Sequence, residues 1–307
     1  MPRAIILYEI DQSFGPNILA EYYLKHDEKI PLTVLKEFSE KHVNKRLLNV
    51  TVRTENNRYY SGKINAESLN KNNFYLSFIL QEGEDLISLK SIFENIEEKI
   101  IQNYTNDKNK MNYFLQDALN SILSLIQKLQ EPKIVKETIN ERTKEMLDDG
   151  KLSEARVLID LGEEIPEKLA EEVKFAEQLL NEKFYRKAKK SFLKAAELAR
   201  IIQEEEIASF LENKGEQVGL FPDLIKEREN ILKEIDKIFN DLKNTQLFSY
   251  DNFFEPVDRL IEISHTFEDH YLLDILTKLK NNTQRASRLT KELNGIEGEI
   301  RELLKKI

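Results

Sequence analysis

Cysteine and tryptophan are absent from this chain of 307 residues, and glycine and proline are scarce, with 9 and 7 copies. Without cysteine, the chain cannot form a disulfide bond, a thiolate metal site or a thiol nucleophile. Glycine and proline supply most tight turns, so their scarcity predicts a few long elements, mostly helices. No stretch approaches the run of about 18 uncharged apolar residues that a membrane-spanning helix needs. We therefore expect a largely helical protein without a transmembrane segment.

Charge is abundant and unbalanced, because 46 basic and 55 acidic residues leave a net charge of −9. Nucleic acids bind to basic surfaces, so this excess of acid argues against a nucleic-acid partner. The apolar residues, 40% of the chain, are enough for a sizeable core. The first apolar run is short and is followed at once by Glu9 and Asp11, unlike a secretory signal peptide. We expect a cytoplasmic protein of about two domains.

The first hundred residues contain short apolar runs separated by polar turns. Residues 3–10 and 17–24 are two such runs, and the loop between them contains Gly15 and Pro16, which predicts a β-hairpin. A helix is expected over residues 30–45 from its apolar spacing. Further runs predict three strands and a second helix, over residues 48–54, 58–64, 73–80 and 85–104. Five strands that bury a face under helices make an α/β sandwich, so the fold class is α+β.

From about residue 108 onward the apolar spacing is helical and no convincing strand remains. Gly162 is taken as the end of a short helix, and Pro166 as the start of the next one. Gly215 and Gly219 are expected to end a long helix that begins at Tyr185. The expected helices cover about 111–131, 133–148, 152–162, 166–180, 185–212, 222–244, 256–266 and 270–307.

These elements divide the chain into four segments: an α/β domain over 1–106, a connecting helix over 107–132, helical hairpins over 133–220 and long helices over 221–307. The third segment contains a weak repeat, in which Ala155 aligns with Ala188, 33 residues further on. This helical-hairpin array resembles tetratricopeptide-type repeats, whose period is about 34 residues. Only two units align, so an ordinary irregular helical bundle stays open as the alternative.

The clearest periodicity is at the end of the chain, where residues step alternately by four and three from Ile275 to Ile307. Such a 3.5-residue repeat is typical of a coiled-coil-like seam, which needs a partner helix to cover it. Residues 224–242 have the same spacing and offer an antiparallel partner within the chain. A homodimer or heteromer through residues 272–307 is the alternative, and fraying at two glycines is a third. The seam comprises Leu289, Leu293, Ile296, Ile300, Leu303 and Ile307.

The sequence contains no motif for phosphate binding, dinucleotide binding or a serine nucleophile elbow. Among its four histidines is one Glu-x-x-His arrangement, Glu262 and His265, but a di-iron bundle needs two such motifs and two further glutamates. Neighbouring acidic and basic residues along the helices are typical of exposed faces. We therefore expect no catalytic, cofactor-binding or metal-binding residues, and a protein that is not an enzyme.

The first third of the chain resembles a longin-type domain in the order of its elements. The resemblance is carried by the strand AIILYEI, the hairpin DQSFGPNILAEYYL, the helix around Leu35 and Phe38, and the strand FYLSFIL before DLISLKSIFENIEEKI. A roadblock-type domain usually begins with a helix, whereas here a strand starts at residue 3; profilin-like and sensor-type sheets stay open. Longin domains are protein-interaction modules of vesicle-fusion proteins, adaptor subunits, tethering complexes and small-GTPase regulators, with archaeal relatives. We expect no C-terminal membrane anchor, which would favour a soluble scaffold over a fusion protein.

The resemblance implies a non-enzymatic adaptor or scaffold whose partners are proteins, such as a small GTPase or a membrane-trafficking complex. The candidate contact residues are the hairpin tip Phe14, Gly15 and Pro16, and Val34, Phe38, Val50 and Val52 on the first helix and the adjacent strand. The alternatives are an ordinary turn and ordinary core packing under the sheet. A ligand-sensing or signalling regulator with a helical output region is the second functional hypothesis, and a hydrolase with a clustered acid/base pocket is the third.

Overall fold

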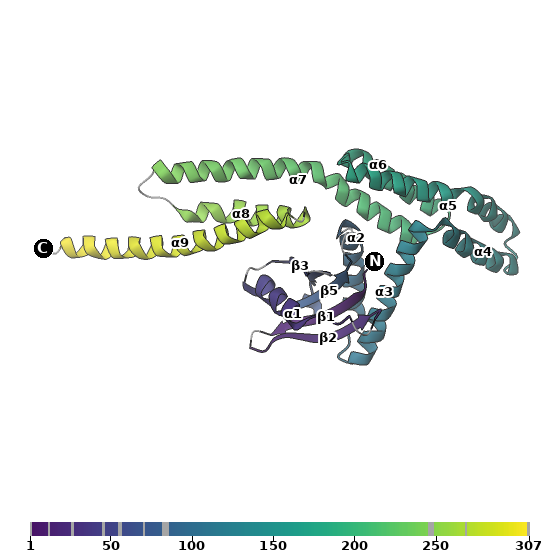
Figure 1. Cartoon of the computed structure of the whole chain (residues 1–307), viewed down its shortest axis with the longest axis horizontal. Helices are drawn as coiled ribbons and strands as arrows, with labels where there is room; N and C mark the ends of the chain where they lie inside the picture. The colour runs from purple at the N-terminus through teal and green to yellow at the C-terminus, as the bar shows by residue number, and fades with distance from the viewer. Residues whose placement is uncertain are drawn as a thin grey trace. The chain divides into compact units, whose positions relative to one another are not determined.

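The structure, a computed structural model, describes residues 2–11, 13–25, 28–44, 47–54, 57–69, 71–81, 86–244, 249–267 and 269–305. The fold is α+β, with one antiparallel sheet near the N-terminus and helices over most of the rest (Figure 1). Contacts divide the chain into two compact units, Met1–Phe221 and Pro222–Ile307. The finer division into four segments stays a prediction. No helix in the described part of the chain is long and apolar enough to cross a membrane.

Five strands form the sheet: β1 (Ala4–Asp11), β2 (Gly15–Tyr23), β3 (Asn49–Arg53), β4 (Arg58–Lys63) and β5 (Phe74–Leu80). They lie in the order β2-β1-β5-β4-β3, and every neighbouring pair is antiparallel. The central strands β1 and β5 are almost continuously apolar, as expected of strands that are covered on both faces. The predicted order of strands and helices is confirmed for this part of the chain.

Helices cover both faces of the sheet. On one face, α1 (Leu32–Ser39) and a short π-helical turn (Glu40–Asn44) pack on alternate residues of β1, such as Ile6 and Tyr8. On the other face, α2 (Leu86–Asn103) and α3 (Lys108–Gln130) pack on the intervening residues, such as Ile5 and Leu7. Successive side chains of a strand point to opposite faces, so a single apolar run serves both cores.

Side chains contact both edges of the sheet. At the edge strand β2, the backbone N–H of Glu21 donates a hydrogen bond to Asn112 Oδ1 of α3, at 2.9 Å. At the other edge, Lys41 Nζ donates to the backbone carbonyl of Thr51 in β3, at 3.4 Å. An edge strand otherwise presents unpaired N–H and C=O groups. Each contact therefore occupies one backbone group of an edge strand.

Four helices follow the sandwich: α4 (Pro132–Asp148), α5 (Leu152–Asn181), α6 (Tyr185–Ile201) and α7 (Glu205–Asn244). They pack closely because small residues, such as Ala188 and Ala195 of α6, stand at the contacts. A Cβ atom added to Gly162 of α5 would lie 2.8 Å from Ile139 Cγ2 of α4, so this contact requires glycine. One apolar core runs from the α2–α3 face of the sheet to Val218 of α7.

The helix boundaries predicted at Gly162 and Pro166 are wrong, because both residues lie inside the continuous helix α5. The missing side chain of Gly162 serves the close approach of α4 and not a helix end. Pro166 has no N–H and cannot bond to the carbonyl four residues earlier. Both residues are buried on the face that packs in the array, and this packing offsets the lost bond.

The helix predicted over residues 185–212 is also wrong, because α6 ends at Ile201 and α7 begins at Glu205. The residues that were expected to separate two later helices lie inside α7: Gly215, Gly219 and Pro222. The turn between α6 and α7 contains neither glycine nor proline; Gln203 instead adopts a left-handed conformation, with φ +60°. That conformation costs about 1 kcal/mol for a residue with a side chain, so other contacts must stabilise the turn.

The second unit contains the second half of α7, a 3₁₀ turn (Tyr250–Phe253), α8 (Phe254–Thr266) and α9 (His270–Leu304). α8 and α9 form a helical hairpin (Figure 1). Arg259 of α8 donates to Glu227 of α7 at 2.7 Å, and the Asp269 carboxylate caps α9 by accepting from the Leu272 N–H at 3.1 Å.

Candidate functional site

The β1–β2 hairpin places Phe14 in solvent, with 92% of the residue exposed. The Asp11 carboxylate builds the turn by accepting hydrogen bonds from the backbone N–H groups of Ser13 (2.7 Å) and Phe14 (2.9 Å). Gly15 has φ +83°, which glycine adopts without strain, and Pro16 continues the pairing of β2 with β1. The tip is therefore a well-defined turn that presents an aromatic ring, and its binding to a partner stays a prediction.

The other predicted contact residues pack inside the protein. Val34 and Phe38 of α1 and Val50 and Val52 of β3 are each at most 4% exposed, and all four belong to the core under α1. These four side chains hold α1 against the sheet, as the alternative of ordinary core packing predicts. A partner that binds at this layer would have to contact other side chains, on the outer face of α1.

A chain of buried hydrogen bonds crosses the same layer. The Tyr8 hydroxyl lies 2.7 Å from Ser61 Oγ, which lies 2.9 Å from His42 Nε2, and His42 Nδ1 lies 2.6 Å from the Leu47 carbonyl oxygen. Because a carbonyl oxygen only accepts, Nδ1 carries the proton of the neutral ring; Nε2 then accepts from Ser61, and Ser61 accepts from Tyr8. Burial lowers the pKa of His42 to about 4 and raises the pKa of Tyr8 well above its ordinary value.

This network is structural, although a serine beside a histidine is also the pattern of an activated nucleophile. Ser61 is fully buried, so no substrate reaches its hydroxyl. The second nitrogen of His42 faces a backbone carbonyl and not a carboxylate that would orient a catalytic base. Sequence reasoning missed the network because its members come from β1, β4 and the π-helical turn, and no local motif links them.

The seam predicted at the end of the chain is exposed along the second half of α9. The described members, Leu289, Leu293, Ile296, Ile300 and Leu303, are 50–60% exposed, and all described residues from 291 to 305 are exposed. Ile307 lies outside the described residues. Five apolar residues at coiled-coil spacing thus face solvent on one helix.

The first half of α9 packs on α8 and the 3₁₀ turn through a different stripe. The buried residues there are Leu273, Leu276, Thr277, Thr283 and Ser287, whereas Ile275 of the predicted seam is exposed. On α7, the stripe with matching spacing is partly covered: Ile231 is buried, and Leu224, Ile235 and Ile238 are half-buried. The side chain of Leu242 lies outside the described part.

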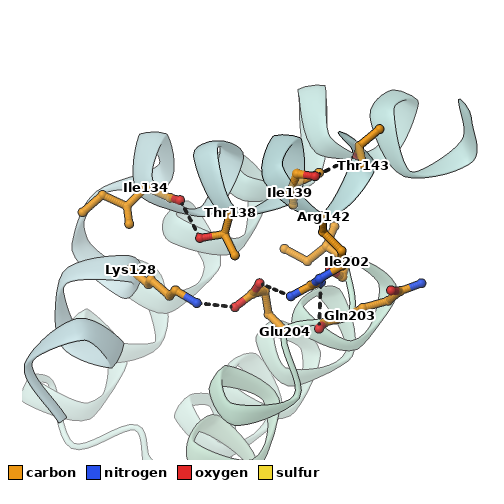
Figure 2. Close-up of polar contacts among 9 residues, drawn as sticks. All are labelled: Lys128, Ile134, Thr138, Ile139, Arg142, Thr143, Ile202, Gln203 and Glu204. Carbon is orange, nitrogen blue, oxygen red and sulfur yellow. Dashed lines mark hydrogen bonds and ion pairs between the residues drawn. The ribbon is translucent and has the colours of Figure 1, made fainter. Parts of the chain in front are cut away.

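At the turn between α6 and α7, one buried carboxylate joins three parts of the array (Figure 2). Glu204, 4% exposed, accepts from Lys128 Nζ of α3 at 2.9 Å and from Arg142 Nη2 of α4 at 3.0 Å. Arg142 Nη1 also donates to the carbonyls of Ile202 (3.1 Å) and Gln203 (3.0 Å). These bonds satisfy carbonyls at the end of α6 and stabilise the left-handed Gln203. The cluster fixes where α7 begins.

Phe210, on the second turn of α7, borders two pockets together with Ile92 of α2 and Ile122 of α3. Pocket A, lined by α2, α3, α5 and α7, has a volume of ≈ 590 Å³; pocket B, lined by α2, α3 and the start of α7, has a volume of ≈ 460 Å³. The wall of pocket A is mainly aliphatic and includes Leu80, Leu89, Ile92, Ile122, Ile126, Leu129, Val173 and Leu211. Sequence reasoning missed both pockets.

A third pocket, of ≈ 510 Å³, lies between α2 and the end of β4. Its lining mixes charges of both signs, from Lys63, Lys71 and Lys90 and from Glu67, Glu94 and Glu97. Lys71 already pairs with Glu9 at 3.0 Å and lies over the rings of Phe74 and Tyr104. A lining with balanced charges selects no ligand of one sign, so we do not assign a function to it.

Within the described ranges, no group of three or more metal-binding side chains is placed to hold an ion. Comparison of the chain with known proteins adds no information, because no family model, no curated protein and no solved structure matches it.

Proposed function

We propose that this protein is a non-enzymatic protein–protein interaction adaptor or scaffold, and that the second half of α9 is its partner-binding surface. One observation carries the proposal: a stripe of apolar residues at 3.5-residue spacing is exposed from Leu289 to Leu303. Exposed apolar stripes mark interaction sites, and this spacing suits a second helix that packs knobs into holes. The stripe spans 15 residues, about 22 Å of helix.

An amphipathic helix is the partner chemistry that this surface fits, and a second copy of α9 supplies one. The proposed homodimer forms through residues within 272–307. The first half of α9 is packed on α8, so the second half is the part that meets the second copy. Residues beside the stripe are charged, among them Glu292, Glu297 and Arg301. An apolar centre with a charged rim is typical of protein interfaces.

Light scattering tests the homodimer with two double variants of the full chain. Leu293→Asp with Ile300→Asp puts two charges on the stripe and is expected to convert a dimer into a monomer, because buried unpaired charges are costly. Asn281→Asp with Asn294→Asp adds the same charge at exposed positions of α9 outside the stripe and is expected to leave the dimer intact. A wild-type chain that stays monomeric at every concentration would reject the homodimer.

The N-terminal sandwich supports the same class of function. Its order of strands and helices agrees with the longin resemblance, which implies a small GTPase or a trafficking component as the partner. The test is binding of purified small GTPases, in both nucleotide states, to the immobilised full chain and to a Phe14→Ser variant. Failure of all of them to bind the wild-type chain would count against this partner class, while the α9 surface would remain to be tested separately.

A second candidate function is a ligand-sensing regulator with a helical output region. Pockets A and B favour it, because both are bordered by α7, and α7 continues from the first unit into the second. A small molecule that raises the melting temperature of the full chain in a saturable way would support this function.

A further inference from the structure

Helix α6 and the turn before it contain the densest group of basic side chains in the protein. Residues 183–194 include six lysines and arginines and no acidic residue. Outside this stretch, the remaining 40 basic residues are outnumbered by all 55 acidic ones, which leaves a net charge of −15. A solvated helix face usually mixes both signs of charge along its length. The stretch is therefore a local exception in an acidic protein.

Two of the six cations serve the packing of α6 in the array. Lys189 pairs with Glu216 of α7 at 2.5 Å. Lys194 pairs with Glu172 of α5 at 2.6 Å. The other four, which we call the basic face, are exposed and form no ion pair within the described structure: Lys183, Arg186, Lys187 and Lys190.

The basic face lies opposite the buried side of α6. Lys190 follows Arg186 by four residues and Lys187 by three, so these three side chains share one side of the helix. The residues that pack in the array, such as Ala188 and Ala195, lie on the other side and are fully buried. The four cations are thus presented to solvent together and are not used to hold the fold.

Phe184 adds an apolar ring beside these cations. It is 51% exposed, and Lys187 Nζ lies 5.2 Å from the centre of its ring. The turn is held by backbone hydrogen bonds from the N–H groups of Lys183 (2.9 Å) and Phe184 (2.8 Å) to carbonyls at the end of α5. Lys183 has φ +63°, a left-handed conformation that glycine or asparagine usually adopts at such a place.

We propose that the basic face and Phe184 bind the surface of a bilayer that contains anionic lipids. Such a surface offers a layer of negative head groups to the cations and an apolar boundary to the ring. Three of the four cations are lysines, whose compact charge suits a diffuse layer of anions, whereas recognition of one phosphate or carboxylate favours the fork of arginine. None of the three pockets described above includes a residue of the basic face.

This inference goes beyond the adaptor function and is independent of partner binding by α9 and of the ligand-sensing alternative. The contact would be peripheral, since only side chains of one turn and one helix face take part. An acidic segment of another protein could also attract the cations, but it would gain little from an exposed phenylalanine ring among them. The ring therefore distinguishes the bilayer from a soluble polyanion.

Co-sedimentation of the full-length chain with vesicles tests the proposal. We expect binding to phosphatidylcholine vesicles with about one third phosphatidylserine, little binding to phosphatidylcholine alone, and weaker binding at high salt. Lys187→Gln with Lys190→Gln should weaken binding about 25-fold, because each lysine near an anionic bilayer strengthens binding about fivefold. The matched control, Lys110→Gln with Lys144→Gln, removes two exposed lysines of α3 and α4 and should bind nearly as the wild type does.

The absence of tryptophan from the chain makes the position of the ring measurable. Phe184→Trp introduces a single indole, whose fluorescence should shift to shorter wavelengths when phosphatidylserine vesicles are added, because the ring leaves water. Tyr113→Trp places the indole at a position of α3 that is 70% exposed, and its emission should stay that of an indole in water.

The outcomes separate the bilayer from other partners. No binding to the phosphatidylserine vesicles, or equal binding by the two double lysine variants, overturns the proposal. An unshifted emission of vesicle-bound Phe184→Trp overturns the insertion of the ring. If soluble polyglutamate binds as tightly as the vesicles at equal charge concentration, and Phe184→Ser leaves vesicle binding undiminished, the surface belongs to an acidic protein and not to a bilayer.

Discussion

Helices α3 and α9 have similar apolar spacing in the sequence but opposite surroundings in the structure. On α3, Met111, Leu115 and Ile122 are buried between the sheet and the helical array. On the second half of α9, the matching residues are half exposed or more, and no described part of the chain covers them. Periodicity therefore predicts that a helix forms and which face is apolar, but it does not predict what covers that face.

Burial of the α3 stripe has the largest expected effect. Leu115→Ala should lower the free energy of unfolding by about 2 to 5 kcal/mol, because it removes packed methyl groups and leaves a cavity. Leu293→Ala on α9 should cost less than about 0.5 kcal/mol in a monomeric chain, because that side chain is exposed. Urea unfolding at several protein concentrations measures both. A large, concentration-dependent cost of Leu293→Ala would show that a second copy covers the stripe.

Acidification should destabilise the sandwich and leave the exposed half of α9 unaffected. Burial lowers the folded-state pKa of His42 from its ordinary value of 6.5 to about 4, so the unfolded chain binds more protons between these two pH values. The contribution of His42 to the free energy of unfolding is then complete above pH 6.5. It is lost as the pH drops towards 4, by about 3 kcal/mol in total. Chemical unfolding across this range measures the slope, and a His42→Gln variant that kept the same slope would contradict the assignment.

Loss of the buried Glu204 carboxylate, which pairs with α3 and α4, should lower the free energy of unfolding more than loss of a surface carboxylate. Glu204→Ala should cost about 2 kcal/mol, because Lys128 and Arg142 lose their partner in a mostly buried place. Glu212→Ala is the matched control, since Glu212 pairs with Arg200 on an exposed face, and its loss should cost below about 1 kcal/mol. Equal melting temperatures for the two variants would remove the special role of Glu204.

The smallest expected effect concerns the glycines of α9. A Cβ atom added to Gly295 or Gly298 meets nothing within 4 Å, and glycine lowers helix stability by about 1 kcal/mol relative to alanine. The double variant Gly295→Ala and Gly298→Ala should therefore increase the helical circular dichroism signal without changing the unfolding of the first unit. A drop in that signal would mean that the glycines serve a close contact.

Much of the fold could be predicted from local patterns. The short apolar runs of the first hundred residues predicted the five strands, and their continuous apolar character followed from cover on both faces. The first error in the helical array is the pair of helix ends predicted at Gly162 and Pro166, where the close approach of α4 and tertiary packing decide the structure. The turn at Gln203 has no local signal, because the distant Arg142 stabilises it.

Less of the site could be predicted. The α9 stripe and the exposed Phe14 are local features, and the sequence pointed to both. The network around His42 and the two pockets at Phe210 depend on residues that are far apart in the chain, such as Tyr8 with Ser61, and Ile92 with Phe210. Such pairs become visible only when the sheet register and the helix packing are known.

The contacts of Asn112 and Lys41 with the outer strands affect how other molecules can be recognised. Recognition by strand addition requires a free row of backbone donors and acceptors along an outer strand, and here side chains from neighbouring helical segments interrupt that row on each side. The same interruptions discourage sheet-to-sheet self-association, a common route to aggregation. A binding partner of this domain is thus expected to contact its side chains and not to add a strand to its sheet.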